Sequence, residues 1–532
     1  MPLDYVPKPL VVVILDGWGI SAEKRGNAVA AADTPTMNML ARHYPSASLQ
    51  AAGVEVGLPW GEMGNSETGH TNIGAGRVAY QTLPYIDNEI HNGEFFKNKE
   101  LLSAIEHAKQ YESKLHLMGC LSTGGIHSHI NHLLALLDMV KKNGLRDKVF
   151  VHVFTDGRDV PQQSAVGFIA QLEERMAKLG IGKIASVTGR MYAMDRNQSW
   201  DRTKMTYDLL TGTSWEKGAA SAKEAVESSY SAGIFDEKIL PTVVTRGGEL
   251  IAKIEENDAV IFFNFRPDRA RQITRAFAQA DFMSFDRKSI PGNVRFVTMT
   301  RYDPDIPAPA AYLEHTVDYP IARILSEASF KQLHIAETEK YAHITYYLNG
   351  GYEKPFPNEK HVLIRSSQVK DFAEEPRMKA GEITNALLAE LSQTDYDIAF
   401  VNFANADMVG HTGNYVAAVE ACTFVDQCLR RVYEAVVPSG GALLVTADHG
   451  NAEEMINLQS NELTTDHTAN PVPIHFVYDR LKRTTPRSDN ELQDLFANPI
   501  GMLADVAPTI LDIMQVPQPQ SMTGISLLDS LQ

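Results

Sequence analysis

Short apolar runs of strand length alternate with segments of helical periodicity along almost the whole of this sequence. Four pairs of a strand-like run and a following helix-like stretch are 114–120 with 129–142, 148–154 with 164–179, 259–265 with 268–280, and 396–403 with 414–436. This alternation predicts βαβ units, which build mostly parallel sheets with helices on both faces. We therefore expect an α/β fold.

The chain has 532 residues, too many for a single hydrophobic core. Residues 303–309 carry alternating prolines, which favour an extended and fairly stiff connection. A second crossing between domains is expected near 81–84. These two crossings predict an inserted α/β domain at 83–309 within a discontinuous domain formed by 1–82 and 310–532. Both crossings are expected to act as hinges.

Composition argues against several classes of protein. The formal net charge of −17 disfavours a nucleic-acid or anionic-membrane partner. The three cysteines, Cys120, Cys422 and Cys428, form neither a CxxC metal motif nor a disulfide framework, and the last two fall inside an expected helix. No apolar run approaches the length of a membrane span, and the N-terminus lacks the cationic region of a signal peptide. We expect a cytoplasmic monomer.

Side chains able to bind metal ions follow several of the apolar runs, where open α/β sheets bind ligands. These candidates are Asp16, Ser66, Asp407, His411, Asp448, His449 and His467. Three carboxylates, three imidazoles and a hydroxyl on one edge suit two divalent metals and an activated serine, a combination typical of phosphoryl transfer. Because no thiolate is present, the set favours Mn²⁺ or Mg²⁺ and leaves Zn²⁺ and Co²⁺ open.

Each of these residues also has an ordinary structural role open to it. Asp16, directly after a strand, is a common helix cap or turn former, and Asp407 with His411 forms an i, i+4 pair that occurs on many helix surfaces. Ser66 precedes a possible helix. There it is either an N-cap or a phosphoryl acceptor favoured by the helix amides and a nearby cation. Taken together, the strand-end segments favour the metal site.

The expected inserted domain carries a different set of side chains, dominated by arginine. Its candidates are His127, Arg158, Asp159, Arg190, Arg196, Arg266 and Arg269. Guanidinium groups bind carboxylate and phosphate through two hydrogen bonds, so five of them in strand-end loops predict an anion clamp. Solvated or interdomain arginines are the alternative. Lys340, beyond the proline-rich stretch, is expected either to reach the same cleft or to begin a charged helix.

Longer motifs extend these observations along the chain. They are LDGWG (15–19), MGNSETGH (63–70), GGIHSH (124–129), FTDGRD (154–159), TGRMYAMDR (188–196), FFNFRPDRARQ (262–272), ETEKYAH (337–343), ADMVGHTGN (406–414), TADHGN (446–451) and HTANPVP (467–473). With these motifs the chain resembles the cofactor-independent (2,3-bisphosphoglycerate-independent) phosphoglycerate mutases of the alkaline phosphatase superfamily, nearly from end to end. The resemblance implies an alkaline-phosphatase-like three-layer metal domain with a second α/β domain inserted.

The resemblance also implies an activity and residue roles. The activity is the glycolytic interconversion of 3-phosphoglycerate and 2-phosphoglycerate, with Ser66 as the nucleophile that carries the phosphoryl group. One Mn²⁺ would be held by Asp16, Ser66, Asp448 and His449, and the other by Asp407, His411 and His467. The implied substrate-binding residues are His127, Arg158, Asp159, Arg190, Arg196, Arg266, Arg269 and Lys340.

Within that scheme we expect Asp159, with His127 as second choice, to exchange a proton with the glycerate hydroxyl, and Lys340 to stabilise the developing alkoxide. Three alternatives stay open: a metal-dependent phosphatase or phosphodiesterase, a mutase for another phosphorylated metabolite, and a non-catalytic sensor. A plain hydrolase has no need of a clamp for its product, and a sensor would have lost Ser66 or a ligand. Both considerations favour the mutase.

Overall fold

A computed structural model describes residues 6–313, 317–457 and 460–531 of the chain. The predicted α/β class is confirmed over these residues, since helices alternate with strands that form two mostly parallel sheets. No helix among them is both long enough and apolar enough to cross a membrane.

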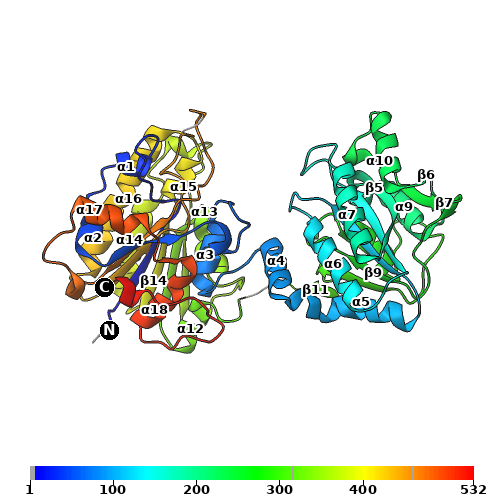
Figure 1. Ribbon diagram of the computed structural model, residues 1–532. Coiled ribbons are helices and arrows are strands. Elements are labelled where there is room, and N and C mark those ends of the chain that lie inside the picture. Colours follow the sequence, from blue (N-terminus) through cyan, green and yellow to red (C-terminus); the bar gives the residue numbers. More distant parts are fainter. Residues whose placement is uncertain (1–5, 314–316, 458–459, 532) are drawn as a thin grey trace. The chain divides into compact units, whose positions relative to one another are not determined.

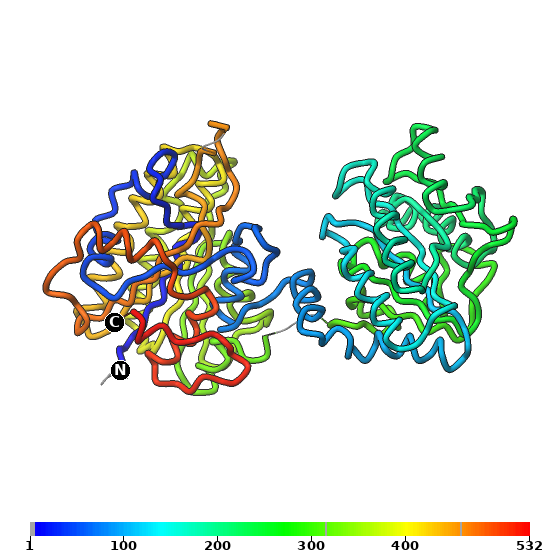
Figure 2. The backbone as a smooth tube through the Cα atoms, viewed as in Figure 1, coloured from blue at the N-terminus to red at the C-terminus, as the bar shows by residue number. Residues whose placement is uncertain are grey.

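The chain divides into two compact units. Unit 1 is discontinuous and combines residues 1–81 with 316–532, whereas unit 2 consists of residues 82–315. Figure 2 shows the blue N-terminal segment of unit 1 running among its yellow and red C-terminal segments. The sequence predicted the second boundary at 309/310. However, β11 (Ala310–Tyr312) pairs with β10 (Arg295–Thr300), so this strand extends the sheet of unit 2.

Within the described residues, unit 1 is built around an eight-stranded sheet in which only β16 runs against its neighbours. The order across the sheet is β13 (Glu359–Ile364), β12 (Gln332–Glu337), β14 (Ile398–Phe403), β1 (Leu10–Leu15), β15 (Ala442–Thr446), β16 (Val472–Val477), β2 (Ser46–Gln50) and β17 (Gly501–Met502). Every residue of β1 is at most 1% exposed, because this strand of β-branched and leucine residues lies at the centre of the sheet and is covered on both faces.

Helices cover the unit 1 sheet (Figure 1). The longer ones are α2 (Pro35–His43), α3 (Ser66–Ala75), α12 (Ile321–Glu327), α14 (Ala380–Gln393), α15 (Asn405–Gly410), α16 (Tyr415–Val436), α17 (Asp489–Ala497) and α18 (Val506–Ile513), with short helices α1 (Ala28–Ala31), α13 (Thr338–Ala342) and α19 (Leu528–Leu531). Cys422 and Cys428 are buried in α16, so their predicted packing role is confirmed.

The main sheet of unit 2 is also mostly parallel, with β7 antiparallel to β5. The order across it is β11, β10, β9 (Ala259–Phe262), β3 (Leu115–Leu121), β4 (Val149–Thr155), β5 (Lys183–Gly189), β7 (Thr242–Arg246) and β6 (Lys217–Ala219), and β8 (Glu249–Leu250) pairs with β7. Its helices are α4 (Thr82–Asn92), α5 (Lys99–Gln110), α6 (Ile130–Lys142), α7 (Ala165–Leu179), α8 (Arg190–Ala193), α9 (Trp200–Thr211), α10 (Ala222–Ser231) and α11 (Arg271–Ala278).

Alternate residues of β3 enter two separate hydrophobic cores. Leu115 and Leu117 pack with α5, α6 and α7, whereas Met118 and Cys120 pack with α9 and α11. Because successive side chains of a strand point to opposite faces, helices must cover both faces of this sheet. This confirms the arrangement predicted from the sequence.

Predicted elements agree with the observed ones to within one or two residues, with one exception of functional interest. The strand predicted at 259–265 ends at Phe262, and the helix predicted at 268–280 spans Arg271–Ala278. The backbone of Phe265 leaves the sheet because its N–H donates to the carbonyl of His127, at 2.9 Å. The loop that follows carries several of the predicted arginines.

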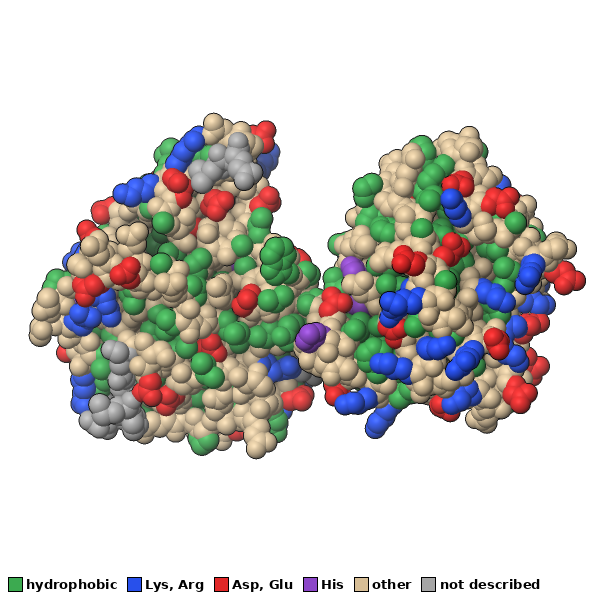
Figure 3. All heavy atoms as spheres, in the orientation of Figure 1, with side chains coloured by type: hydrophobic (Ala, Val, Ile, Leu, Met, Phe, Trp, Pro, Cys, Tyr) green, Lys and Arg blue, Asp and Glu red, His purple; other side chains and the backbone are tan. Residues whose placement is uncertain are grey.

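Acidic and basic side chains are interspersed over the face shown in Figure 3. Other ionisable groups are almost completely buried, among them Asp16, Asp407, Asp448, His449, Lys340 and Arg190. Burying charge is costly unless the groups are paired. The positions of these residues therefore indicate where a functional polar site is expected.

Candidate active site

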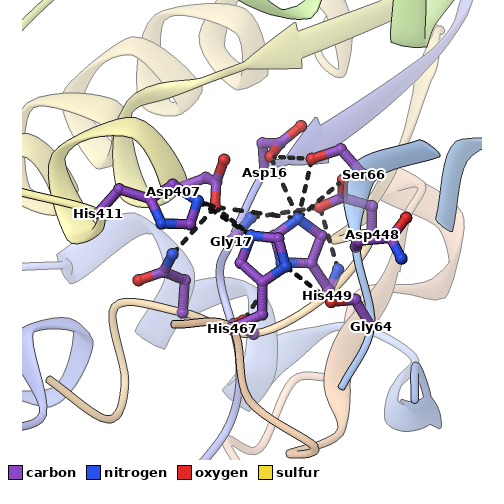
Figure 4. A network of polar contacts seen from close by, with 12 residues as sticks. Asp16, Gly17, Gly64, Ser66, Asp407, His411, Asp448, His449 and His467 are labelled. Carbon is purple, nitrogen blue, oxygen red and sulfur yellow. Dashed lines mark hydrogen bonds and ion pairs between the residues drawn. The ribbon is translucent and has the colours of Figure 1, made fainter. Parts of the chain in front are cut away.

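Three neighbouring strands bring acidic segments to one edge of the unit 1 sheet. β1 lies between β14 and β15 in parallel register. Asp16 follows β1, Asp407 lies on α15 just after β14, and Asp448 with His449 follows β15. Parallel strands end at a common edge, so these side chains meet there, as Figure 4 shows.

Ser66 is the first residue of α3. The helix is capped by Asn65, whose side chain accepts a hydrogen bond from the amide of Thr68 at 2.9 Å. The alternative of Ser66 as N-cap is therefore wrong, and its hydroxyl is free to face the cluster. Ser66 Oγ donates to Asp16 Oδ1 at 3.1 Å and lies 2.9 Å from His449 Nε2.

A glycine permits the close approach of α3 to the strand-end loop. A Cβ on Gly69 would lie 2.5 Å from the backbone oxygen of Asp448, well inside van der Waals contact. Any side chain at this position would push the helix, and Ser66 with it, away from the acidic edge.

The three predicted imidazole ligands share one orientation. Each donates its Nδ1–H to a backbone carbonyl, with nitrogen–oxygen distances of 2.6 Å for His411 to Thr465, 3.2 Å for His449 to Gly450 and 2.8 Å for His467 to Gly64. The Nε2 atoms are then left facing the cluster, and those of His411 and His467 are 3.0 Å apart. Metal-binding histidines are held in this way.

Asp407 lies close to all three of these imidazoles. Its Oδ1 lies 3.1 Å from His411 Nε2 and 3.2 Å from His467 Nε2. His449 Nε2 is intermediate, 3.6 Å from Asp16 Oδ1 and 4.0 Å from Asp407 Oδ1. Geometrically it groups with Asp407 and His467 as a set able to hold one ion, whereas the resemblance assigns it to the ion beside Asp16.

Sequence reasoning missed His70, which groups with Asp16 and Asp448. Its Nδ1–H donates to the carbonyl of Ser66 at 2.9 Å, and its Nε2 accepts from Asn402 Nδ2 at 3.0 Å. Asn402 also donates to Asp16 Oδ2 at 2.8 Å. The signal was present, because His70 follows Ser66 by four residues and so lies on the same face of α3.

Lys340 extends from α13 into this cluster of unit 1. Its Nζ is 2.6 Å from Ser66 Oγ, from Asp16 Oδ1 and from Asp407 Oδ2. Burial would lower the pKa of Lys340, but Asp16 and Asp407 outweigh burial and hold this pKa well above its ordinary value. The ammonium is therefore permanently charged.

The pKa of the Asp16 carboxyl group shifts in the opposite direction, whereas that of His449 shifts in the same direction as that of Lys340. Burial would raise the pKa of Asp16, yet Lys340 and His449 hold it far below its ordinary value. For His449, burial would lower the pKa, but Asp448 and Asp16 raise it to about 10. The three buried carboxylates are therefore balanced in this structure by the Lys340 ammonium and the protonated His449 ring.

The donor set fits divalent metal ions. It combines carboxylate oxygens with imidazole nitrogens and lacks thiolates, as hard to borderline ions prefer. Asp448 Oδ2 is buried and accepts no hydrogen bond, although it lies 3.2 Å from His70 Nδ1, whose proton goes to Ser66. A buried anionic oxygen without a donor is costly, and a cation would satisfy it.

In unit 2, Arg190 is buried at 2% exposure and pairs with two carboxylates. Its Nη1 lies 2.5 Å from Asp156 Oδ1 and 2.6 Å from Asp159 Oδ2. His127 Nε2 is 3.8 Å from the same oxygen of Asp159. Burial and the charge of Arg190 lower the pKa of His127 to about 4, so its imidazole is neutral near pH 7.

Asp268 joins other members of the arginine set, a role that sequence reasoning missed. It lies 2.8 Å from Arg196, 3.3 Å from Arg266 and 3.5 Å from His127 Nδ1. Arg269 donates to the carbonyl of Met194 at 3.1 Å. The side chains of Arg158, Arg196 and Arg266 are about half exposed, which leaves their guanidinium groups accessible to an anion.

The fold and the two polar clusters define an α/β protein with a candidate metal centre in unit 1 and an arginine-rich cluster in unit 2. Residues 86–304 match the family described as BPG-independent PGAM N-terminus (iPGM_N). The chain is 48% identical to 2,3-bisphosphoglycerate-independent phosphoglycerate mutase of Clostridium perfringens (strain 13 / Type A), over 98% of this chain and 99% of the relative. It is 46% identical to the protein of the same name from Moorella thermoacetica, with the same coverage.

A solved structure agrees with these relatives. The phosphoglycerate mutase of Leishmania mexicana, crystallised at low cobalt concentration, is 32% identical and superposes with a TM-score of 0.54, covering 98% of each chain. This chain belongs to the 2,3-bisphosphoglycerate-independent phosphoglycerate mutase family. The resemblance predicted from the motifs is thereby confirmed.

Proposed function

We propose that this protein interconverts 3-phosphoglycerate and 2-phosphoglycerate through a phosphoserine at Ser66, without 2,3-bisphosphoglycerate. The observation that carries the proposal is the environment of Ser66 Oγ. An ammonium, an imidazole and a carboxylate lie within hydrogen-bond distance of it: Lys340 at 2.6 Å, His449 at 2.9 Å and Asp16 at 3.1 Å. Family membership supports the same reaction.

Two divalent ions, most simply Mn²⁺, complete the proposed site. Asp16, Ser66, Asp448 and His449 would hold one, and Asp407, His411 and His467 the other. When bound, such ions neutralise the charge of the transferring phosphoryl group and favour the alkoxide form of a serine. His449 lies between Asp16 and Asp407, so it is placed to bind either ion. His70 lies beside Asp448, so it is placed to contact the ion held by Asp16 and Asp448.

Ser66 is proposed to attack the phosphorus of 3-phosphoglycerate in line with the departing 3-oxygen. The Lys340 ammonium donates a hydrogen bond to Oγ and so stabilises the developing alkoxide. As the first residue of α3, Ser66 also places the transferred group beside the unpaired amides of the helix N-terminus. The phosphoryl group then returns from Oγ to the 2-oxygen of the same glycerate.

The unit 2 cluster is proposed to bind the phosphoglycerate through His127, Arg158, Arg190, Arg196, Arg266 and Arg269. Asp159 is the proposed acid–base that returns a proton to the 3-oxygen and removes one from the 2-hydroxyl, with neutral His127 as the alternative. Arg190 differs from the other arginines because it is buried against Asp156 and Asp159. We propose that it orients the Asp159 carboxylate.

The test is incubation of metal-loaded protein with 3-phosphoglycerate in the absence of bisphosphoglycerate, while 2-phosphoglycerate and free phosphate are both measured. We expect 2-phosphoglycerate to accumulate without phosphate release. Release of phosphate with no 2-phosphoglycerate would show that the protein is a phosphatase.

We also propose that the protein is a monomer located in the cytoplasm. Analytical sedimentation tests the monomeric state.

A further inference from the structure

A second cluster of potential ligands lies at the edge of the unit 1 sheet, on strands β12 and β13. His334 of β12 is in register with His361 of β13, and Glu359 precedes His361 by two residues. Strand residues two apart share a face, so the three side chains project from the same side of the sheet. Their ligand atoms all lie within 4.8 Å of one another.

The cluster is enclosed by the protein. The side chains of His334 and Glu359 are fully buried and that of His361 is 9% exposed. Glu359 Oε1 lies 2.5 Å from His361 Nε2 and accepts from Asn349 Nδ2 at 2.7 Å. None of these residues belongs to the cluster around Ser66.

The orientation of His334 leaves two acceptors facing each other. Its Nδ1–H donates to the carbonyl of Ile344 at 2.8 Å, so a neutral ring carries a lone pair at Nε2. That nitrogen is buried without a hydrogen-bond partner and lies 3.6 Å from Glu359 Oε1. The amide oxygen of Asn349 is likewise buried without a partner.

The protonation states of His334 and Glu359 match those of metal ligands, and a bound ion would displace the proton between His361 Nε2 and Glu359 Oε1. Burial lowers the pKa of His334, which favours the neutral ring. Burial would raise the pKa of Glu359, but His361 and His334 outweigh it and hold this pKa below its ordinary value. With the ring neutral, no proton lies between Nε2 and the carboxylate oxygen 3.6 Å away, and a cation bound there would satisfy both acceptors.

We propose that His334, Glu359 and His361 form a further divalent-cation site, separate from the phosphoryl-transfer site and suited to Zn²⁺. Two imidazoles and one carboxylate are a common zinc ligand set, and the Nδ1–H of His334 on a backbone carbonyl is the usual support for such a ligand. Asn349 supports the carboxylate of the set, because its Nδ2 donates to Glu359 Oε1 at 2.7 Å.

Such an ion would add a cross-link between β12 and β13 at the edge of the sheet. β13 is the outermost strand, and its residues are partly buried or exposed even though the Glu359 side chain is enclosed. Ile344, the partner of His334, lies in the π-helical turn His343–Tyr347 that directly follows α13 and Lys340. The site would therefore stabilise the segment that presents Lys340.

The test counts metal ions in the full chain. Protein stripped with a chelator is saturated with Mn²⁺, Zn²⁺ is added, and total Mn plus Zn per chain is measured by mass spectrometry after gel filtration. We expect the total to rise by one equivalent in the wild type and not to rise in His361→Ala. His475→Ala is the matched control, because His475 is a buried imidazole of unit 1 that bonds Ser46 and lies outside the cluster.

The wild-type count is decisive even where a variant fails to fold. An unchanged total after zinc addition would overturn the proposal, and so would the same rise in a folded His361→Ala. We also expect Mn²⁺-loaded His361→Ala to retain isomerase activity, since His361 has no contact with the residues around Ser66. In the wild type, zinc should raise the thermal midpoint of unit 1, and the variant should lack this rise.

Discussion

At the scale of single residues, Lys340, His449 and Asp16 all lie within hydrogen-bond distance of one oxygen atom, Ser66 Oγ. Replacing Ser66 by Ala is expected to reduce isomerisation by at least about 10³-fold, because a nucleophile that carries the group has no substitute. The coupled conversion of 3-phosphoglycerate measures this. Circular dichroism should be unchanged, and Ser392→Ala, an exposed serine of the same unit, should keep full activity. Surviving activity in Ser66→Ala would remove the phosphoserine from the scheme.

Arg190 and Arg158 belong to the same proposed substrate set but differ in burial. Arg190→Ala would leave the buried Asp156 carboxylate without its cation, so we expect the free energy of unfolding of unit 2 to fall by about 3–5 kcal/mol. Arg158 is 56% exposed and lies 3.7 Å from Glu237, so Arg158→Ala should cost less than about 1 kcal/mol. Urea denaturation measures both. Equal losses would mean that burial does not distinguish them.

At the scale of elements, the start of α3 couples helix capping to the candidate site. Asn65→Ala removes the side chain that caps the helix, and we expect a stability loss of about 1 kcal/mol together with a lower kcat, since Ser66 follows directly. Asn98→Ala is the control, because Asn98 caps α5 in unit 2. It should lose similar stability without losing kcat. A kcat loss common to both variants would contradict this coupling.

The end of β12 carries a carboxyl group whose environment predicts a pH-dependent stability. Burial raises the pKa of Glu337 from 4.5 to about 7, against hydrogen bonds from Ser366 and the Lys379 amide. The folded state then binds the proton more tightly than the unfolded state. Protonation of Glu337 therefore stabilises the folded state fully below about pH 4.5. This contribution to the free energy of unfolding, about 3 kcal/mol, is lost as the pH rises to about 7.

Glu337→Gln should therefore be more stable than the wild type at pH 8 and similar to it at pH 4.5. Urea denaturation of unit 1 at both pH values measures the difference. Glu339→Gln, an exposed neighbour, is the control and should show little change with pH. A wild type whose stability is flat between these pH values would show that Glu337 is ionised throughout.

At the scale of the whole molecule, metal loading should be linked to protons. His449 has its pKa raised to about 10, so at pH 7 its ring holds a proton that a metal must displace, and Asp407 raises the pKa of His411 in the same direction. We expect Mn²⁺ binding at pH 7 to release protons, seen by calorimetry in buffers of different ionisation enthalpy. Chelation should abolish isomerisation, and activity should fall steeply below about pH 6. Binding without proton release would contradict imidazole ligation.

The sequence predicted the α/β class and most elements because their signals are local. A run such as Leu10–Leu15 is apolar in every position, and α16 shows its periodicity over 22 residues. Strand-end Asp and His residues could be named for the same reason. Their mutual distances could not, because these depend on which strands are neighbours: Leu10 of β1 pairs with Ile398 of β14 and with Ala442 of β15.

By itself, the sequence determined the family, the alternation of strands and helices, and the residue types available for chemistry. Only the tertiary structure decided how those residues are used. It assigned the helix cap to Asn65, brought His70 and Asn402 to the acidic edge, made Asp268 a partner of the arginines, and kept residues 310–312 in unit 2. The physical reason is that side-chain roles depend on burial and on contacts between distant segments, whereas periodicity and motifs are properties of neighbouring residues.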